Sequence, residues 1–94
     1  MELNDVIHQP VRLRVMSALI SLENGARINF VELRDLTGST DGNLGAHLLK
    51  LEEAGYILTE KKFVARKPCT FIRITNKGRA AFEEYVESLR RILP

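Results

Sequence analysis

The sequence predicts an α+β fold that is mostly helical and forms a single domain over residues 1–94. Three observations lead to this prediction. Apolar residues recur at helical spacing in four stretches, only a short glycine-containing turn separates the second stretch from the third, and two runs rich in β-formers lie between the third and the fourth. A chain of 94 residues buries only a modest core, so a second copy would be a natural supplement to its stability.

The charges are unevenly distributed along the chain, although the net charge is only +2. The stretch from Glu60 to Arg73 contains five basic side chains and one acidic side chain, a local net charge of +4. Basic charge gathered in one segment is expected where a protein contacts phosphates. The composition therefore favours a nucleic-acid partner.

Several classes of protein are disfavoured by what the sequence lacks. A single cysteine, Cys69, allows no internal disulfide and no multi-cysteine metal cluster. No apolar run approaches the roughly 20 residues that span a bilayer, and the first residues, MELNDVIHQP, have no apolar segment typical of a secretory signal. No phosphate-binding glycine loop or nucleophile motif indicates an enzyme. We therefore expect a cytoplasmic protein that is not an enzyme and needs no cofactor.

The centre of the chain, residues 30–54, predicts two short helices joined by a tight turn. The first helix spans Phe30 to Thr37, and Gly38 ends it because glycine readily adopts the left-handed backbone of a helix C-terminus. The second spans Asp41 to Ala54. An ordinary helical hairpin would need the same glycine and leucines, but this arrangement is also the signature of a helix-turn-helix. The residues expected on the buried faces are Phe30, Leu33, Leu36, Leu44, Leu48, Leu51 and Ala54.

The exposed first turns of the second helix favour the helix-turn-helix interpretation. They contain small or polar residues, which suit a helix end that enters a groove, whereas a solvated helix more often carries long charged residues there. Ser39 and Thr40 can each cap this helix, since a hydroxyl accepts a hydrogen bond from an unpaired backbone N–H. The residues in question are Thr40, Asp41, Gly42, Asn43, Gly45 and Ala46.

The residues before this centre predict a helical lead-in over Met1–Gln9, a firm helix over Val11–Glu23 and a short strand near Ile28. Pro10 suits the first turn of the helix because its missing N–H is no loss there. Asn24 and Gly25 are expected to end it, and Asn29 is expected to cap the helix that follows. Its apolar stripe consists of Leu13, Met16, Leu19 and Ile20.

The residues after the centre predict a β-hairpin over residues 56–75 and a last helix over residues 76–93. The strands are Tyr56–Lys62 and Cys69–Thr75, with a loop over Phe63–Pro68 whose tip is basic. Thr75 is expected to cap the helix Asn76–Leu93. This helix has a long apolar face, more than a small core needs, which invites a partner.

Three segments together resemble the ArsR/MarR-like winged helix-turn-helix transcriptional regulators. These are HQPVRLRVMSALI, STDGNLGAHLLKLEEAGYI, and the hairpin followed by ITNKGRAAFEEY. The resemblance covers Ile7 to Tyr85. It implies a three-helix core with a β-hairpin wing and a C-terminal dimerisation helix. It also implies a homodimer that binds double-stranded DNA, with two recognition helices in successive major grooves about 34 Å apart.

Under this interpretation, the start of the recognition helix reads base edges in the major groove, and the basic wing contacts the phosphate backbone or the adjacent minor groove. Ser39 and Thr40 could instead serve only as caps, and Asp41 could merely favour the helix N-terminus. The candidate DNA-binding residues are Ser39, Thr40, Asp41, Asn43, Ala46, Lys50, Lys61, Lys62, Arg66 and Lys67. The candidate dimerisation residues are Leu3, Val6, Ile7, Phe82, Tyr85, Val86, Leu89, Ile92 and Leu93.

The sequence departs from the family pattern in the middle of the recognition helix. Many relatives have Ser followed by Arg or His where this chain has Gly45 and Ala46. The helix before the turn contains no cysteine, so metal sensing is not implied, and nothing identifies a small-molecule effector. His47 is expected to be structural. Two alternatives stay open, a winged-helix module for protein interaction and a low-specificity DNA-coating protein.

Overall fold

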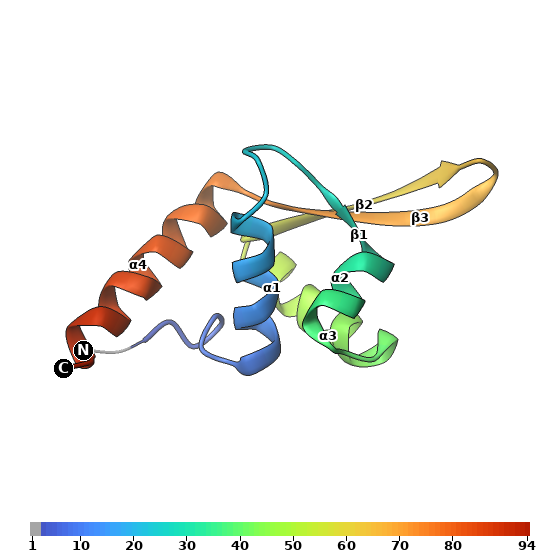
Figure 1. The fold of residues 1–94 in the computed structure, drawn as a ribbon. Helices are drawn as coiled ribbons and strands as arrows, with labels where there is room; N and C mark the ends of the chain where they lie inside the picture. Colours follow the sequence, from blue (N-terminus) through green and yellow to red (C-terminus); the bar gives the residue numbers. More distant parts are fainter. Residues whose placement is uncertain (1–2) are drawn as a thin grey trace.

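Four helices and three strands follow one another in the predicted order in the computed structural model, which describes residues 3–94 (Figure 1). The strands form one antiparallel sheet in the order β1-β3-β2. The predicted α+β, mostly helical class is confirmed, and the predicted short strand pairs with the hairpin through Ile28 and Asn29. The elements are α1 (Pro10–Ile20), β1 (Ile28–Asn29), α2 (Phe30–Thr37), α3 (Asp41–Glu53), β2 (Ile57–Val64), β3 (Lys67–Ile74) and α4 (Asn76–Ile92).

Three helices begin at the capping residues that the sequence predicts. The side chains of Asn29, Thr40 and Thr75 each accept a hydrogen bond from the backbone N–H three residues further on. Each bond satisfies one of the N–H groups that a helix start leaves unpaired. Gly38 ends α2 with a left-handed φ of 66°. Local sequence chemistry therefore sets the boundaries of the helix-turn-helix.

The core lies where α1, α2 and α3 meet the sheet, and α4 closes it through Tyr85. Two predictions for this core need correction. Leu36 is 68% exposed, because Thr37 takes the buried position in the last turn of α2. Val15 is fully buried although the predicted stripe omitted it, and Leu13 and Ile20 are only partly buried.

The first helix differs from its prediction at both ends. α1 starts at Pro10, where the side chain of Gln9 accepts from the N–H of Arg12, and it ends at Ile20 rather than Glu23. Gly25 has a φ of 83° but belongs to the following turn. Helical spacing continues beyond the point at which the chain must turn back toward β1, so periodicity alone overestimates the length.

The helical lead-in predicted over Met1–Gln9 is wrong for the part that the structure describes, while Met1 and Glu2 lie outside the described residues. Residues 4–8 form turns in which the side chain of Asn4 accepts from the N–H groups of Val6 and Ile7. An asparagine side chain that bonds nearby N–H groups competes with helix formation. The segment is nevertheless anchored, since Ile7 is fully buried.

The hairpin is longer and its turn is tighter than predicted. β2 and β3 pair over all eight residues of each strand, so the turn consists of Ala65 and Arg66 alone. Both have positive φ, 51° and 67°, as the two-residue turns that match strand twist require. The prediction of a loop over Phe63–Pro68 is therefore wrong for its outer members, which are strand residues: Phe63, Val64, Lys67 and Pro68.

Alternation of side chains gives the hairpin two faces. Thr59 and Lys61 line a shallow groove together with Gly45 and Leu49 of α3, so their face is the one toward the helices. We call it the inner face of the wing. On β2 it consists of Ile57, Thr59, Lys61 and Phe63, and on β3 of their partners Ile74, Ile72, Thr70 and Pro68. The outer face of β2 consists of Leu58, Glu60, Lys62 and Val64.

The start of α4 approaches the backbone at the end of α3. A Cβ placed on Gly78 would lie 2.1 Å from the carbonyl oxygen of Tyr56, and this carbonyl also accepts from the N–H of Thr75. A side chain at Gly78 would therefore force α4 away from the domain. By contrast, a Cβ on Gly45 would meet nothing within 4 Å.

Gly78→Ala and Gly45→Ala should change stability in opposite directions. We expect Gly78→Ala to lower the free energy of unfolding by about 1–3 kcal/mol through overpacking. Gly45→Ala should raise it by up to about 1 kcal/mol, because alanine is the better residue inside a helix. Urea unfolding of both variants measures this. If Gly78→Ala were as stable as the native chain, the close approach to Tyr56 would be wrong.

Candidate nucleic-acid interface

The third helix, α3, buries an apolar stripe on one side, and its opposite side is exposed to solvent. Leu44, Leu48 and Leu51 are at most 4% exposed. A Cβ on Gly42 or Gly45 would meet nothing within 4 Å, so packing within this chain does not require their small size. Most of the α3 residues predicted to contact DNA lie on this side. The exposed residues from the cap to the middle of the helix are Thr40, Asp41, Gly42, Asn43, Gly45, Ala46, Leu49 and Lys50.

An ion pair fixes the start of α3 to α2. Arg34 donates to the carboxylate of Asp41 at 2.8 Å and to that of Asp35 at 3.1 Å. These two hydrogen bonds raise the pKa of Arg34 above its ordinary value. Asp41 is thus held by a cation of its own chain, which lessens its repulsion of a phosphate. No pattern in the sequence indicates this partner, since a bond between two helices depends on how they cross.

The two hydroxyls before α3 have different roles. Thr40 is the cap, with its hydroxyl accepting from the N–H of Asn43. Ser39 shares a hydrogen bond of 2.9 Å with the hydroxyl of Thr37, and Thr37 is buried and also donates to the carbonyl of Leu33. Ser39 therefore belongs to the turn that joins the helices, and Thr37 is a structural residue that sequence reasoning missed.

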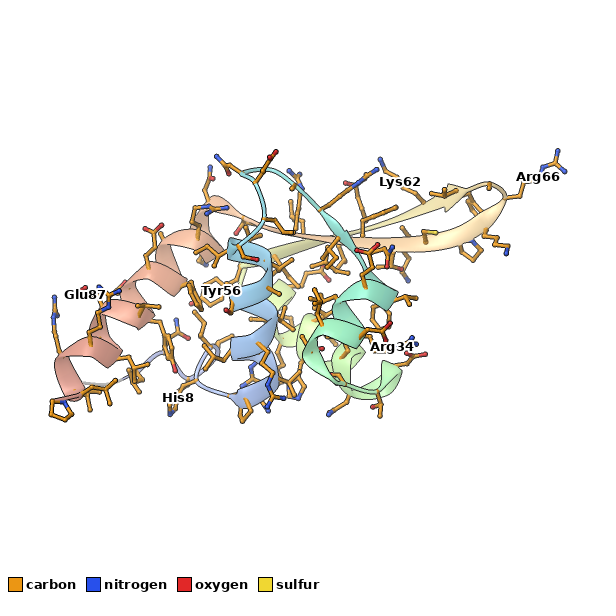
Figure 2. The ribbon with its side chains drawn as sticks, viewed as in Figure 1. His8, Arg34, Tyr56, Lys62, Arg66 and Glu87 are labelled. Atoms are coloured by element: carbon orange, nitrogen blue, oxygen red, sulfur yellow. The ribbon has the colours of Figure 1, made fainter. Side chains whose placement is uncertain are left out.

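The wing carries its basic side chains on a hairpin that extends past the helices (Figure 1). Figure 2 shows Arg66 at its far end, pointing away from the body of the domain. No carboxylate of residues 3–94 lies within salt-bridge distance of Lys61, Arg66 or Lys67. These three cations are therefore available to an anionic partner.

Lys62 differs from the other candidates of the wing. It lies on the outer face and is 3.0 Å from the carboxylate of Glu60. The hydrogen bond from Lys62 is the main reason why the pKa of Glu60 is lowered. Arg27 stacks on Phe71 at 4.2 Å and reaches Glu60 at 3.8 Å. Glu60 engages both Lys62 and Arg27 and offsets part of their charge, so Lys62 is the weakest of the predicted phosphate contacts.

The helix-turn-helix and the wing carry opposite charge. Residues 30–54 contain five acidic and two basic side chains, a net charge of −3, whereas residues 57–74 have a net charge of +4. Between the two lies the groove of about 290 Å³ lined by Gly45 and Leu49 of α3 and by Thr59, Lys61 and Thr70 of the wing. The arrangement presents a neutral, small-residue helix face beside a basic hairpin.

The sequence profile of the winged helix DNA-binding domain family matches residues 11–93. The chain belongs to this family. It is 37% identical over 87 residues, 93% of this chain and 91% of the relative, to an uncharacterized protein of Methanocaldococcus jannaschii. The match confirms the winged helix-turn-helix resemblance seen in the sequence.

Solved structures agree with the fold. A transcriptional regulator homologue from Pyrococcus horikoshii superimposes with a TM-score of 0.81 at 29% identity, covering 93% of this chain and 83% of that one. A putative transcriptional regulator from Salmonella typhimurium gives 0.73 at 18% identity, covering 93% and 74%. The second shares the fold alone.

Among residues 3–94 of the winged helix domain, no three His, Cys, Asp or Glu side chains gather where they could hold a metal ion. Cys69, a half-buried residue of β3, pairs across the hairpin with Lys62. No helix in this part of the chain is long and apolar enough to cross a membrane.

The predicted dimerisation residues divide into three groups. Ile7 and Tyr85 are 0% and 3% exposed, so they hold the protomer together and have no surface for a partner. Their prediction as interface residues is wrong, because an apolar stripe does not tell which members the protomer's own core covers. Ile92 and Leu93 are 52% and 58% exposed. The partly buried members, which pack against the core, are Leu3, Val6, Phe82, Val86 and Leu89.

A hydrogen-bonded arginine ties the N-terminal segment to the recognition helix. Arg12 donates to the backbone carbonyls of Val6 and Asp5 and lies 3.1 Å from Nδ1 of His47. His47 is half-buried, and this contact supports its prediction as a structural residue. His8 also has a partner that the sequence did not reveal, the hydroxyl of Tyr85 at 2.9 Å.

The burial of His47 beside Arg12 should make the stability of the domain depend on pH. Burial, and then the positive charge of Arg12, lower the pKa of His47 below its ordinary 6.5. The unfolded chain therefore binds a proton at a higher pH than the folded one, and the free energy of unfolding falls as the pH drops below about 6.5.

Urea unfolding between about pH 8 and about pH 5 measures this dependence. His47→Asn keeps an acceptor for Arg12 without a titrating group, so it should lose less stability over this range than the native chain. Because His8 is present in both proteins, the difference isolates His47. Equal pH profiles would contradict the assignment.

Proposed function

We propose that this winged helix domain regulates transcription as a homodimer that binds duplex DNA. α3 enters the major groove, and the wing contacts the backbone and the adjacent minor groove. The observation that carries the proposal is the exposed face of α3, made mostly of small and polar residues, beside a basic hairpin. Lys61, Arg66 and Lys67 of this hairpin form no salt bridge within residues 3–94. The transcriptional regulator homologue from Pyrococcus horikoshii, with the same fold over most of both chains, supports it.

The opposite charges of the two parts suggest how they divide the binding. Affinity comes from the wing, where Lys61, Arg66 and Lys67 neutralise phosphates and release counterions. The helix-turn-helix has a net charge of −3 and adds little attraction of this kind. Asn43 and Lys50 remain as polar base-reading side chains, and Ala46 is placed to touch a thymine methyl.

The proposal of a homodimer rests on exposed apolar residues at the end of the molecule opposite the wing. The domain is elongated, with principal extents of 51 × 25 × 21 Å, and α4 lies at the end away from the wing (Figure 1). Ile92 and Leu93 are exposed there, and the segment around Leu3 lies beside α4, since both line one cavity. A two-fold contact at this end leaves α3 and the wing of each copy free for DNA.

A protein-interaction module is the second candidate. The net charge of −3 on residues 30–54 favours it. So do two exposed leucines of the helix-turn-helix, Leu36 and Leu49, whose exposed fractions are 68% and 56%. Selection from a pool of random duplex DNA at two salt concentrations distinguishes the candidates. A two-fold symmetric motif supports the site-specific regulator. Retention without a motif indicates a low-specificity binder, and no retention at low salt favours the protein-interaction module.

Arg66→Ala combined with Lys67→Ala should weaken binding to all sequences alike. Because each phosphate contact contributes about 0.9 to the slope of log K against log[salt], the slope should become shallower by up to about 2. Fluorescence anisotropy between about 50 and about 200 mM salt measures this. The matched variant is Asn43→Ala, which should reduce the preference among sequences more than the overall affinity. Native binding by both variants would contradict these contacts.

Ile92→Glu should convert the dimer into a monomer. The side chain is 52% exposed in the protomer, so the substitution leaves the core intact while placing a charge in the proposed contact. Sedimentation velocity gives the oligomeric state. Arg90→Glu, an exposed change on the same turn of α4, is the control for charge alone. An unchanged dimer in Ile92→Glu would place the interface elsewhere.

A further inference from the structure

The wing exposes an aromatic side chain that the fold does not need. Phe63 is 79% exposed, more than any other large apolar side chain of residues 3–94. It lies one residue before the end of β2 and pairs across the hairpin with Pro68. Exposing a phenylalanine costs hydrophobic free energy and solubility. No packing within the protomer explains its presence at this position.

Phe63 lies on the inner face of the wing. It is two residues beyond Lys61 in the same strand, so both side chains emerge on the face that forms the groove with Gly45 and Leu49 of α3. Near the helices this face is covered, since Ile57 and Ile72 are fully buried. Further out along the hairpin, which extends past the helices (Figure 1), Phe63 and its partner Pro68 are both exposed on the same face and form an apolar patch. Pro68 also lines a hollow with Phe30 and Val31 at the start of α2.

The charges around this patch are positive. Lys61 precedes Phe63 on the same face, and Arg66 lies in the turn beyond it. Lys67 pairs with Val64, so it emerges on the outer face beside the same turn. The acidic residue of the hairpin, Glu60, lies on the outer face and is engaged by Lys62 and Arg27. An apolar side chain with one cation beside it on the same face and another at the tip of the hairpin fits a partner that is polyanionic on its rim and apolar inside. The minor groove of duplex DNA has this character, with phosphates on both edges and stacked bases between them.

We propose that Phe63, supported by Pro68, is an apolar wedge that enters the minor groove of duplex DNA, partly unstacks one base step and bends the duplex. Apolar side chains that enter between base steps of the minor groove act in this way. The proposal rests on the DNA-binding function above and adds a specificity-determining residue to it.

The wedge would also explain how a recognition helix with so few long polar side chains selects a site. Pyrimidine–purine steps such as TA and CA/TG unstack at the lowest cost, so a protein that must unstack one step prefers sequences that supply such a step in the right place. Specificity then comes partly from the deformability of the DNA. We expect sites selected from a random pool to carry a pyrimidine–purine step at a fixed distance from each half-site read by α3.

The experiment uses a selected duplex with 2-aminopurine placed in turn at each step beside the half-site, and a donor and an acceptor dye on its ends. Native protein should raise the 2-aminopurine fluorescence at one step and shorten the end-to-end distance. Phe63→Ala should abolish both signals and weaken binding by about tenfold or more, as loss of a base–aromatic contact does. Phe63→Leu, which keeps an apolar wedge, should retain most of the bend.

Val64→Ala is the matched control. Val64 is the next residue of the same strand and is 48% exposed, but it lies on the outer face. It should leave the affinity, the fluorescence and the bend unchanged. Because Phe63 and Val64 are both exposed, neither Phe63→Ala nor Val64→Ala should alter the melting temperature. Thermal unfolding followed by circular dichroism checks this.

The other outcomes overturn the wedge. If native protein binds duplex DNA and Phe63→Ala leaves both signals and the affinity unchanged, the wedge is wrong and the DNA-binding function stands. The same holds if native protein raises no fluorescence at any step, or if Phe63→Ala dissociates the dimer in sedimentation, which would make Phe63 a contact between copies. If native protein binds no duplex at low salt, the wedge and the proposed function fail together.

Discussion

The burial of Leu44, Leu48 and Leu51 is the constraint on which the rest of the structure depends. These side chains are fully or almost fully removed from water, and burying leucines of this kind contributes about 1.5–3 kcal/mol each. Since they lie on one stripe, they fix the rotation of α3 about its own axis. Gly42 and Ala46 then face outward, Gly45 and Leu49 turn toward the wing, and His47 turns toward Arg12. The exposed face is therefore a consequence of the buried one.

The opposite charges of the helix-turn-helix and the wing separate attraction from recognition. A helix face of small residues allows close approach to a partner but contributes little long-range attraction. The basic hairpin supplies attraction over a Debye length of about 8–10 Å at ordinary ionic strength. The Arg34–Asp41 pair fits this division, because it neutralises the acidic residue nearest the start of α3 while adding no net charge there.

The features that were predictable from the sequence are those set by local chemistry. The caps Asn29, Thr40 and Thr75 and the stop at Gly38 depend on a few neighbouring residues, so a sequence pattern is enough to place them. The exposed side of α3 was predictable for the same reason, because the leucine stripe and the small residues opposite it lie within one short segment.

The features that were missed depend on contacts between distant parts of the chain. The sequence predicts Phe63 and Pro68 as loop residues because no local pattern shows that they pair with each other across the turn. Helical spacing predicts Leu36 as a core residue, because spacing alone does not show how much of a helix face the rest of the fold covers. The bonds of Arg12 to His47 and of Arg34 to Asp41 join separate elements, and no spacing in the sequence encodes them.

The register of the wing has a consequence for how its length can vary during evolution. The two-residue turn of Ala65 and Arg66 holds the strands in strict alternation, so inserting or deleting one residue in β2 between Lys61 and Phe63 would move Phe63 to the outer face. A change of two residues in each strand would preserve the face and alter the reach of the tip by about 7 Å. Natural relatives that keep the same inner face should therefore differ in wing length by even steps, with β2 and β3 changing together.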